Sequence, residues 1–269
     1  LYLKLLKNYW KDQQPYRALY YCYLTDLDAP FHLILSACKP DDPDEEEKIR
    51  LISSEIDRLF TLLQLQNAYD SNEFATNLFL ISKSIRNGAL EDIRPAFDGI
   101  ITSAIASRRG VDEAEVLSYP AFRQTGMNLN IRFKRYFFGR IDEFLSVELN
   151  QGLRQSLYEL VRNRGSKNGF HVEHILAWND ENLALFNDDE EVFEQQRNRL
   201  GGILLLKGSD NISSSNEVYS EKLRSYANTM IWNETLREDT YKSKLDMRAF
   251  KERHQLDNLV PLDHFGPEE

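Results

Sequence analysis

The first half of the chain is patterned for helices, with apolar residues that recur every three or four positions. The clearest run contains five aliphatic residues: Ile49, Ile52, Ile56, Leu59 and Leu63. Residues at this spacing lie on one face of a helix and can pack against a core. Asp42 and Pro43 precede the run as a helix cap and a first-turn proline, and the acidic residues 44–47 suit the positive end of the helix dipole. A long amphipathic helix is therefore predicted to begin here.

Glycines and turn residues divide the rest of this half into further helices. Residues 72–87 and 90–109 are each predicted to form a helix that a following glycine closes. Residues 130–164 predict one or two more helices, with Gly152 between them. No internal repeat or low-complexity segment interrupts the pattern. A helical domain is thus predicted over residues 1–164.

The pattern changes after a polar Gly/Ser/Lys/Asn link at residues 165–169. Two short apolar runs, 170–175 and 202–206, are typical of strands, and the acidic segment between them ends in a helical pattern at 190–199. A polar loop and more helical sequence follow the second run. The predicted fold class is mainly α with a small α+β module, which occupies residues 165–269.

Composition narrows the class of protein. At 269 residues, 42% of them apolar, the chain can hold two ordinary globular domains. No apolar run approaches the roughly 20 residues that span a bilayer, and no signal-peptide pattern opens the sequence. Cys22 and Cys38 form no CxxC pair, so neither a zinc ribbon nor a disulfide framework is predicted. A cytoplasmic protein is expected. The sequence starts without Met inside an amphipathic segment, as a fragment of a longer protein would.

The net charge of −10 argues against nucleic acid as a partner, but the charges are unevenly distributed. Residues 132–167 hold eight Lys or Arg and four acidic residues, whereas residues 173–194 hold eight acidic residues and no basic one. Arg162, Arg164 and Lys167 end the basic stretch, and we predict that they contact phosphate. A solvated basic helix face would give the same pattern.

A carboxylate and a histidine, Glu173 and His174, stand side by side at the end of the first strand-like run, with His171 just before them. A neutral imidazole can accept a proton from water near pH 7. One carboxylate and one amide oxygen, such as those of Glu173 and Asn211, suit Mg²⁺, which prefers oxygen ligands and keeps several waters. Successive residues on a strand point to opposite faces, so Glu173 and His174 converge only if the strand ends or twists there. Residues 177–180 do not continue the alternation, so the strand is predicted to end and the two side chains are predicted to converge on one pocket with Asn211.

The ordered pieces around these residues resemble the HNH endonucleases. The particular version is similar to the C-terminal nuclease domain, DUF1524, of GmrSD-type restriction enzymes. The resemblance covers roughly residues 130–230 and keeps the order of its pieces. These are Arg135-Tyr-Phe-Phe-Gly-Arg-Ile-Asp142, Glu173-His-Ile-Leu176, Leu200-Gly-Gly-Ile-Leu-Leu-Leu206, Asn211 and Tyr219-Ser-Glu-Lys222.

The resemblance implies a ββα-metal (HNH, His-Me finger) nuclease that hydrolyses DNA with Mg²⁺ or Mn²⁺, within a modification-dependent restriction or phage-defence protein. It implies His174 as general base and Glu173 as a metal ligand. Asn211 would be the second metal ligand or would orient the base, and His171 is a further candidate ligand. Lys222 would project from its helix toward phosphate or solvent. Proteins of this type usually carry nucleotide-dependent control in an upstream DUF262 domain, whose motif this sequence lacks, so that control is expected before Leu1.

Two positions depart from the family pattern. Ala177 replaces a proline that shapes the strand exit, and Gly202 replaces an asparagine whose side chain would order the base or its loop. Three functions fit these residues. The first is a DNA endonuclease, and the second is an RNase that uses the same site, since a metal and a base meet only phosphate and water. The third is a helical DNA- or protein-binding module with a vestigial nuclease unit.

Overall fold

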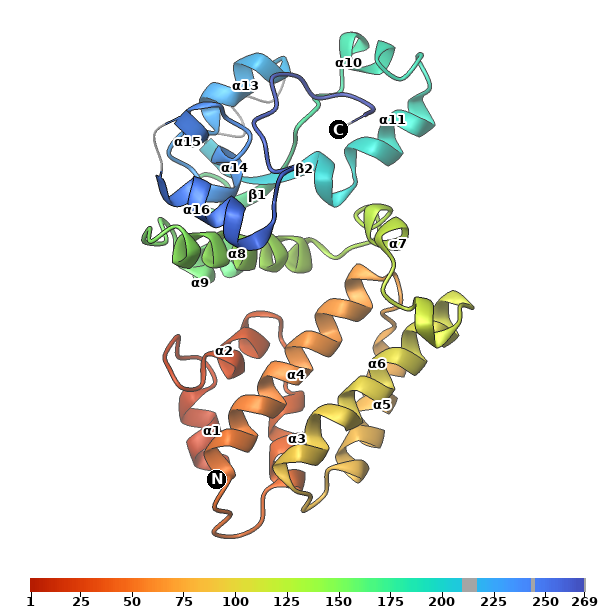
Figure 1. The fold of residues 1–269 in the computed structure, drawn as a ribbon, viewed down its shortest axis with the longest axis vertical. Helices are drawn as coiled ribbons and strands as arrows, with labels where there is room; N and C mark the ends of the chain where they lie inside the picture. The colour runs from red at the N-terminus through yellow and green to blue at the C-terminus, as the bar shows by residue number, and fades with distance from the viewer. Residues whose placement is uncertain (210–216, 243–244, 269) are drawn as a thin grey trace. The chain divides into compact units, whose positions relative to one another are not determined.

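The computed structural model describes residues 1–209, 217–242 and 245–268. The chain divides into two compact units, Leu1–Thr125 and Gly126–Glu269 (Figure 1). The sequence placed the division later, between residues 164 and 165. The observed division is earlier because the helix that begins at Ile131 packs against both strands of the second unit. Within the described part of the chain, no helix combines the length and the hydrophobicity needed to cross a membrane.

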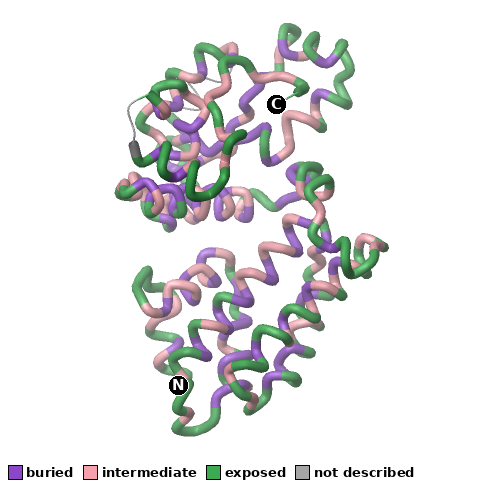
Figure 2. The backbone as a smooth tube through the Cα atoms, in the orientation of Figure 1, coloured by how far each residue is buried: buried purple, intermediate pink, exposed green. Residues whose placement is uncertain are grey.

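The first unit is built around a long helix, α4 (Glu45–Leu65), which contacts α2, α3 and α6. The other α-helices of this unit are α1 (Tyr2–Asn8), α2 (Arg17–Leu24), α3 (Ala29–Ala37), α5 (Ser71–Ser84), α6 (Ile93–Arg109) and α7 (Tyr119–Arg123). The predicted aliphatic face of α4 is buried, and each of its five residues is 2% exposed or less. Figure 2 shows buried segments along this helix. The helical prediction is confirmed for this unit.

Helix α4 begins at Glu45, later than the capping pattern predicted, and its N-cap is Asp44. The Asp42 carboxylate instead accepts hydrogen bonds from the backbone N–H groups of Lys39 and Asp44 and forms a 2.8 Å ion pair with the buried Lys48. The contact with Lys48 is the main reason that the pKa of Asp42 is lowered to about 2. Asp42 therefore organises the turn before the helix rather than capping the helix itself.

The second unit surrounds a small sheet with helices. Among the described residues, β1 (Phe170–His174) and β2 (Ile203–Lys207) pair antiparallel, which confirms both predicted strands. The α-helices of this unit are α8 (Ile131–Glu148), α9 (Leu157–Arg162), α10 (Asp180–Ala184), α11 (Glu190–Arg197), α13 (Tyr219–Ser225), α14 (Ile231–Glu234), α15 (Asp239–Lys242) and α16 (Leu245–His254). The predicted class, mainly α with a small α+β module, is confirmed.

The two faces of the sheet meet different helices, and β1 and β2 lie between α8 and α13 (Figure 1). Directly opposed residues of an antiparallel pair share a face. Glu173 lies opposite Leu204, and His174 lies opposite Ile203. Leu204 packs in a core with Tyr219 of α13, whereas α8 contacts both strands. The sheet therefore directs Glu173 and His174 to opposite sides.

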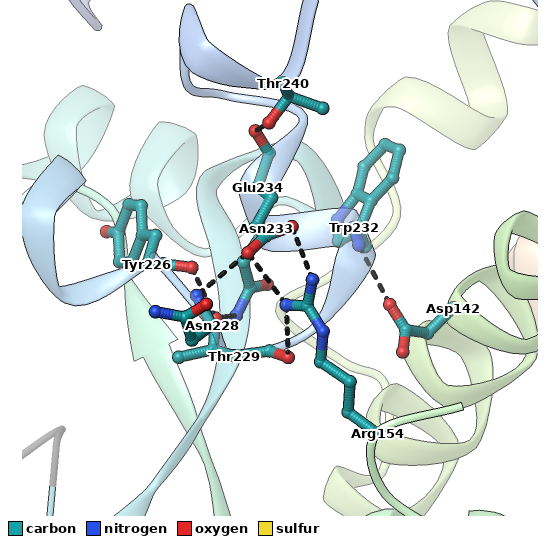
Figure 3. A network of polar contacts seen from close by, with 9 residues as sticks. All are labelled: Asp142, Arg154, Tyr226, Asn228, Thr229, Trp232, Asn233, Glu234 and Thr240. Carbon is teal, nitrogen blue, oxygen red and sulfur yellow. Dashed lines mark hydrogen bonds and ion pairs between the residues drawn. The ribbon is translucent and has the colours of Figure 1, made fainter. Parts of the chain in front are cut away.

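A polar network fastens α8 to α14 (Figure 3). Asp142 of α8 accepts a 2.8 Å hydrogen bond from the backbone N–H of Trp232 in the first turn of α14. Arg154 donates to both carboxylate oxygens of Glu234 at 2.8 Å, and Glu234 also accepts from the backbone N–H of Asn228. Burial raises the pKa of Asp142 to about 6. The acidic residue that ends the matched run 135–142 thus anchors the start of a helix.

Candidate active site

His174 ends β1, and its ring reaches the C-terminal end of α11. Its Nε2 lies 3.0 Å from Oδ1 of Asn198, the residue that follows α11. The Nδ2 of Asn198 lies 2.8 Å from the carbonyl oxygen of Glu194 and 2.5 Å from one carboxylate oxygen of the same residue. His174 is partly exposed. One nitrogen of the imidazole is therefore held by the protein while the residue keeps contact with solvent.

The surroundings of His174 favour its neutral form. Burial is the largest cause of its lowered pKa, and the positive charges of Arg197 and Lys134 lower the pKa further. The hydrogen bond that His174 makes to Asn198 Oδ1 and the charge of Glu194 oppose this shift. Lys134 belongs to α8 and Arg197 to α11, so cations from two elements act on the ring. An imidazole with a lowered pKa is unprotonated at neutral pH, which is the state that a general base requires.

Glu173 lies on the other face of the sheet, where its side chain contacts α13. Its carboxylate forms a buried ion pair with Lys222, whose side chain is 1% exposed against 7% for Glu173. Lys222 Nζ also donates a 2.8 Å hydrogen bond to the backbone carbonyl of His174. Burial raises the pKa of Glu173, although Lys222 opposes the shift. The strand pairing stays regular through His174, so Glu173 and His174 do not converge.

Lys222 differs from its sequence expectation, which placed it toward phosphate or solvent. Because its side chain is buried and its ammonium is committed to Glu173 and to the His174 carbonyl, Lys222 anchors α13 to β1. Glu173 could bind a cation only if its carboxylate left Lys222 or was shared with it.

Of the other two predicted metal ligands, the structure describes His171 but not Asn211. Asn211 lies outside the described residues. His171 Nε2 lies 3.3 Å from the carbonyl oxygen of Gly165, and His171 shares the sheet face of Glu173. Among the residues that the structure describes, no group of three or more His, Cys, Asp or Glu side chains is placed to hold a metal ion. The predicted Mg²⁺ site includes Asn211 and stays a prediction.

The predicted phosphate contacts at the end of the basic stretch are accessible. Arg162 is partly exposed, and Arg164 and Lys167 are exposed. Burial and the positive charges of Arg162 and Arg164 lower the pKa of Arg132, so these guanidinium groups act on one another electrostatically. Arg154, by contrast, is engaged by Glu234 within the unit. The structure thus separates the basic stretch into surface cations and internal ones.

Both positions that depart from the family pattern lie in close packing, which explains the glycine at 202. A Cβ at Gly202 would lie 2.7 Å from the carbonyl oxygen of Arg197, so no side chain fits there while α11 ends as it does. Asn198, from the same turn, instead brings an amide to His174. Ala177 is buried, and its carbonyl accepts a 2.8 Å hydrogen bond from a side chain of α10.

Asn198, Arg197 and Lys134 were not identified as site residues from the sequence. An asparagine at the end of a helix is common. No local sequence pattern indicates that Asn198 contacts the His174 ring, 24 residues away. Lys134 was counted in the basic stretch, but α8 brings it to the His174 face only through tertiary packing.

The second unit thus combines a short antiparallel strand pair, a histidine with lowered pKa at the strand end, and surface cations. A family model described as "GmrSD restriction endonucleases, C-terminal domain" matches residues 127–264, just over half of the chain. The chain belongs to this family, and the match covers nearly all of the second unit, including α8 and α9. Comparisons with curated proteins and with solved structures found no significant match.

Proposed function

We propose that this chain is the nuclease part of a restriction enzyme and hydrolyses DNA phosphodiester bonds by an HNH-type mechanism, with His174 as general base. The environment of His174 carries the proposal. The ring lies at a strand end, it is held at one nitrogen, and burial and two nearby cations keep it neutral. Family membership supports the class of reaction, whereas a role in modification-dependent restriction or phage defence rests on the family alone.

In the proposed step His174 accepts a proton from a water molecule. The water oxygen attacks phosphorus, the bond from phosphorus to the 3′ oxygen breaks, and the leaving oxygen takes a proton from solvent. Lys134 and Arg197 place positive charge near the ring, which favours a phosphate next to the base. A positioned general base contributes about 10² to 10⁴ in rate.

A divalent cation, Mg²⁺ or Mn²⁺, remains part of the proposal, because it would neutralise the charge on the phosphate and the leaving oxygen. Glu173, Asn211 and His171 remain its proposed ligands. Because Glu173 and His171 lie on the sheet face away from His174, the end of β1 would have to twist for the cation and the base to reach one phosphate, and Glu173 would have to share its carboxylate with Lys222. Loss of activity with EDTA, restored by added Mg²⁺, would support this part of the proposal. Full activity in EDTA would contradict it.

Nicking of supercoiled plasmid with Mg²⁺ or Mn²⁺ tests the proposal directly. His174→Ala should lower the rate by about 10² to 10⁴, with circular dichroism unchanged. Because the pKa of His174 is lowered from 6.5, the wild-type rate should rise with pH to a midpoint below 6.5 and level off at neutral pH. His254→Ala, which removes a surface contact with Glu148, is a matched control and should leave the rate unchanged.

The alternatives give distinct results in the same assay. Cleavage of RNA but not of plasmid would favour the RNase. Plasmid binding without cleavage would favour a binding module with a vestigial nuclease unit. Full cleavage by His174→Ala would remove His174 from the mechanism.

A further inference from the structure

We infer that Asn198, held by Glu194, is a positioning residue that fixes His174 in the tautomer protonated at Nε2. Nδ1 is then the ring atom that accepts a proton. The catalytic meaning of this inference rests on the proposed function, whereas the tautomer is a property of the folded chain and can be measured without activity.

The orientation of the Asn198 amide follows from what surrounds it. Its Nδ2 lies 2.8 Å from the carbonyl oxygen of Glu194 and 2.5 Å from a carboxylate oxygen of Glu194, and both of these atoms only accept hydrogen bonds. A flipped amide would direct Oδ1 at two oxygens and lose both hydrogen bonds. Oδ1 therefore faces His174, at 3.0 Å from Nε2. Because Oδ1 can only accept, Nε2 carries the hydrogen.

Glu194 is itself held in place. Its second carboxylate oxygen accepts a 2.9 Å hydrogen bond from Nη1 of Arg197, and Arg197 Nε donates to the carbonyl oxygen of Leu176 at 3.3 Å. Leu176 follows β1 directly, so a chain of hydrogen bonds runs from the strand exit through α11 and back to the His174 ring. Each donor in this chain meets an acceptor, which leaves the amide a single favourable orientation.

Two glycines allow the turn that carries Asn198 to lie where it does. A Cβ at Gly126 would lie 2.2 Å from the carbonyl oxygen of Asn198 and 2.6 Å from Cα of Arg199. A Cβ at Gly202 would lie 2.7 Å from the carbonyl oxygen of Arg197. Backbone approaches this close on both sides enclose the turn that carries Asn198, so packing fixes the backbone of this residue and hydrogen bonds fix its amide.

This arrangement decides which ring nitrogen can act as base. In a neutral imidazole one nitrogen donates and the other accepts. With Nε2 donating to Asn198, the lone pair available for a water proton belongs to Nδ1. After His174 takes that proton, Nε2 still carries its hydrogen, so the contact with Asn198 persists through the step.

Long-range ¹H–¹⁵N correlation spectra of the full chain test the inference. They are recorded at about pH 8, where the ring is neutral. The His174 resonances are assigned by their loss in His174→Gln. We expect the shift of a protonated nitrogen at Nε2 and of an unprotonated one at Nδ1. Asn198→Leu should move both shifts toward the average of a mixed population and should lower kcat roughly tenfold to hundredfold with KM little changed.

Two variants of α11 make the test specific. Glu194→Gln keeps an acceptor for the Asn198 amide and should preserve the tautomer, whereas Glu194→Leu should mix it. Gln195→Leu alters an exposed neighbour on the same helix and should change nothing. Wild-type protein with its hydrogen on Nδ1, or Asn198→Leu with wild-type shifts, would overturn the inference. The expected tautomer in a protein that cleaves no nucleic acid would leave the inference standing and remove the proposed function.

Discussion

Glu173 and His174 are neighbours in the chain, but a regular strand sends their side chains to different helices. The Glu173 side chain pairs with Lys222 of α13, and the His174 ring contacts Asn198 after α11. Lys222 joins the two sides, because it also donates to the His174 carbonyl. Glu173 therefore fixes β1 to α13, whereas His174 presents its ring at the strand end.

The Glu173–Lys222 pair should be costly to break by removing one partner alone. Lys222→Met would leave a buried carboxylate without its counter-charge, and we expect it to lower the free energy of unfolding by about 3–5 kcal/mol. Lys222→Met combined with Glu173→Gln should cost clearly less than the sum of the single changes. Urea unfolding of the four proteins measures this coupling.

The exposed pair Lys242–Glu238 is a matched control, because its side chains are 59% and 61% exposed. Lys242→Met should cause no measurable change in stability. Additive effects of the two changes at Glu173 and Lys222 would show that the buried contact does not couple the strand to α13.

At the level of elements, helices and strands could be predicted where local pattern and tertiary packing agree. The face of α4 at residues 49–63 shows this agreement, as do both strands. The start of α4 was placed too early because Asp42 looks like a cap in sequence, although its carboxylate is taken by Lys48. The burial of Lys222 was missed for a related reason, since a lysine on a helix carries no local sign of a buried partner 49 residues away.

The candidate site was predictable only in part, because its contacts join separate elements. His174 was proposed from the order of the motif pieces, and it stays a prediction. Asn198 and Lys134 reach it through the ends of α11 and α8. Spacing along the chain does not encode such contacts. Asn211, which the motif also suggested, remains a prediction outside the described residues.

The anchoring of α14 by Asp142 predicts a pH-dependent stability. The pKa of Asp142 is about 6 in the folded protein against an ordinary value of 3.8, so between these values the folded chain holds a proton that the unfolded chain has released. Stability should therefore rise as pH falls through this window, by up to about 3 kcal/mol from this group. Asp142→Asn keeps an acceptor for Trp232 and should flatten the dependence.

Urea unfolding at several pH values between 4 and 7 compares the two proteins. Wild type and Asp142→Asn should converge toward the acid end and separate toward neutral pH, with the variant the more stable there. Parallel curves would show that Asp142 ionises normally in the folded protein.

At the level of the whole molecule, a net charge of −10 coexists with surface cations just before β1. We expect weak, salt-sensitive DNA binding, with log affinity falling by about 0.9 per log unit of salt for each phosphate neutralised. Arg164→Ala with Lys167→Ala should weaken binding and reduce that slope by up to about 2. Fluorescence anisotropy over a range of salt concentrations measures both quantities.

Arg154→Ala is the matched control for charge, because Arg154 pairs with Glu234 inside the unit. It removes a positive charge from the same stretch of sequence but should lower stability and leave the salt slope unchanged. An equal change of slope in this control would mean that net charge alone, rather than the surface cations, sets the affinity.

Because Lys222 is buried, the rate at which a reagent modifies it reports how often α13 moves away from β1. Amine-reactive reagents modify lysines that solvent can reach, and at 1% exposure the Lys222 ammonium is shielded while α13 rests on β1. Its acylation, followed by mass spectrometry, should lag far behind that of exposed Lys167 and should proceed only as fast as the nuclease unit opens. A ligand that binds only the closed form should slow acylation of Lys222 in proportion to occupancy. The acylation rate of Lys222 therefore measures ligand binding without any assay of cleavage.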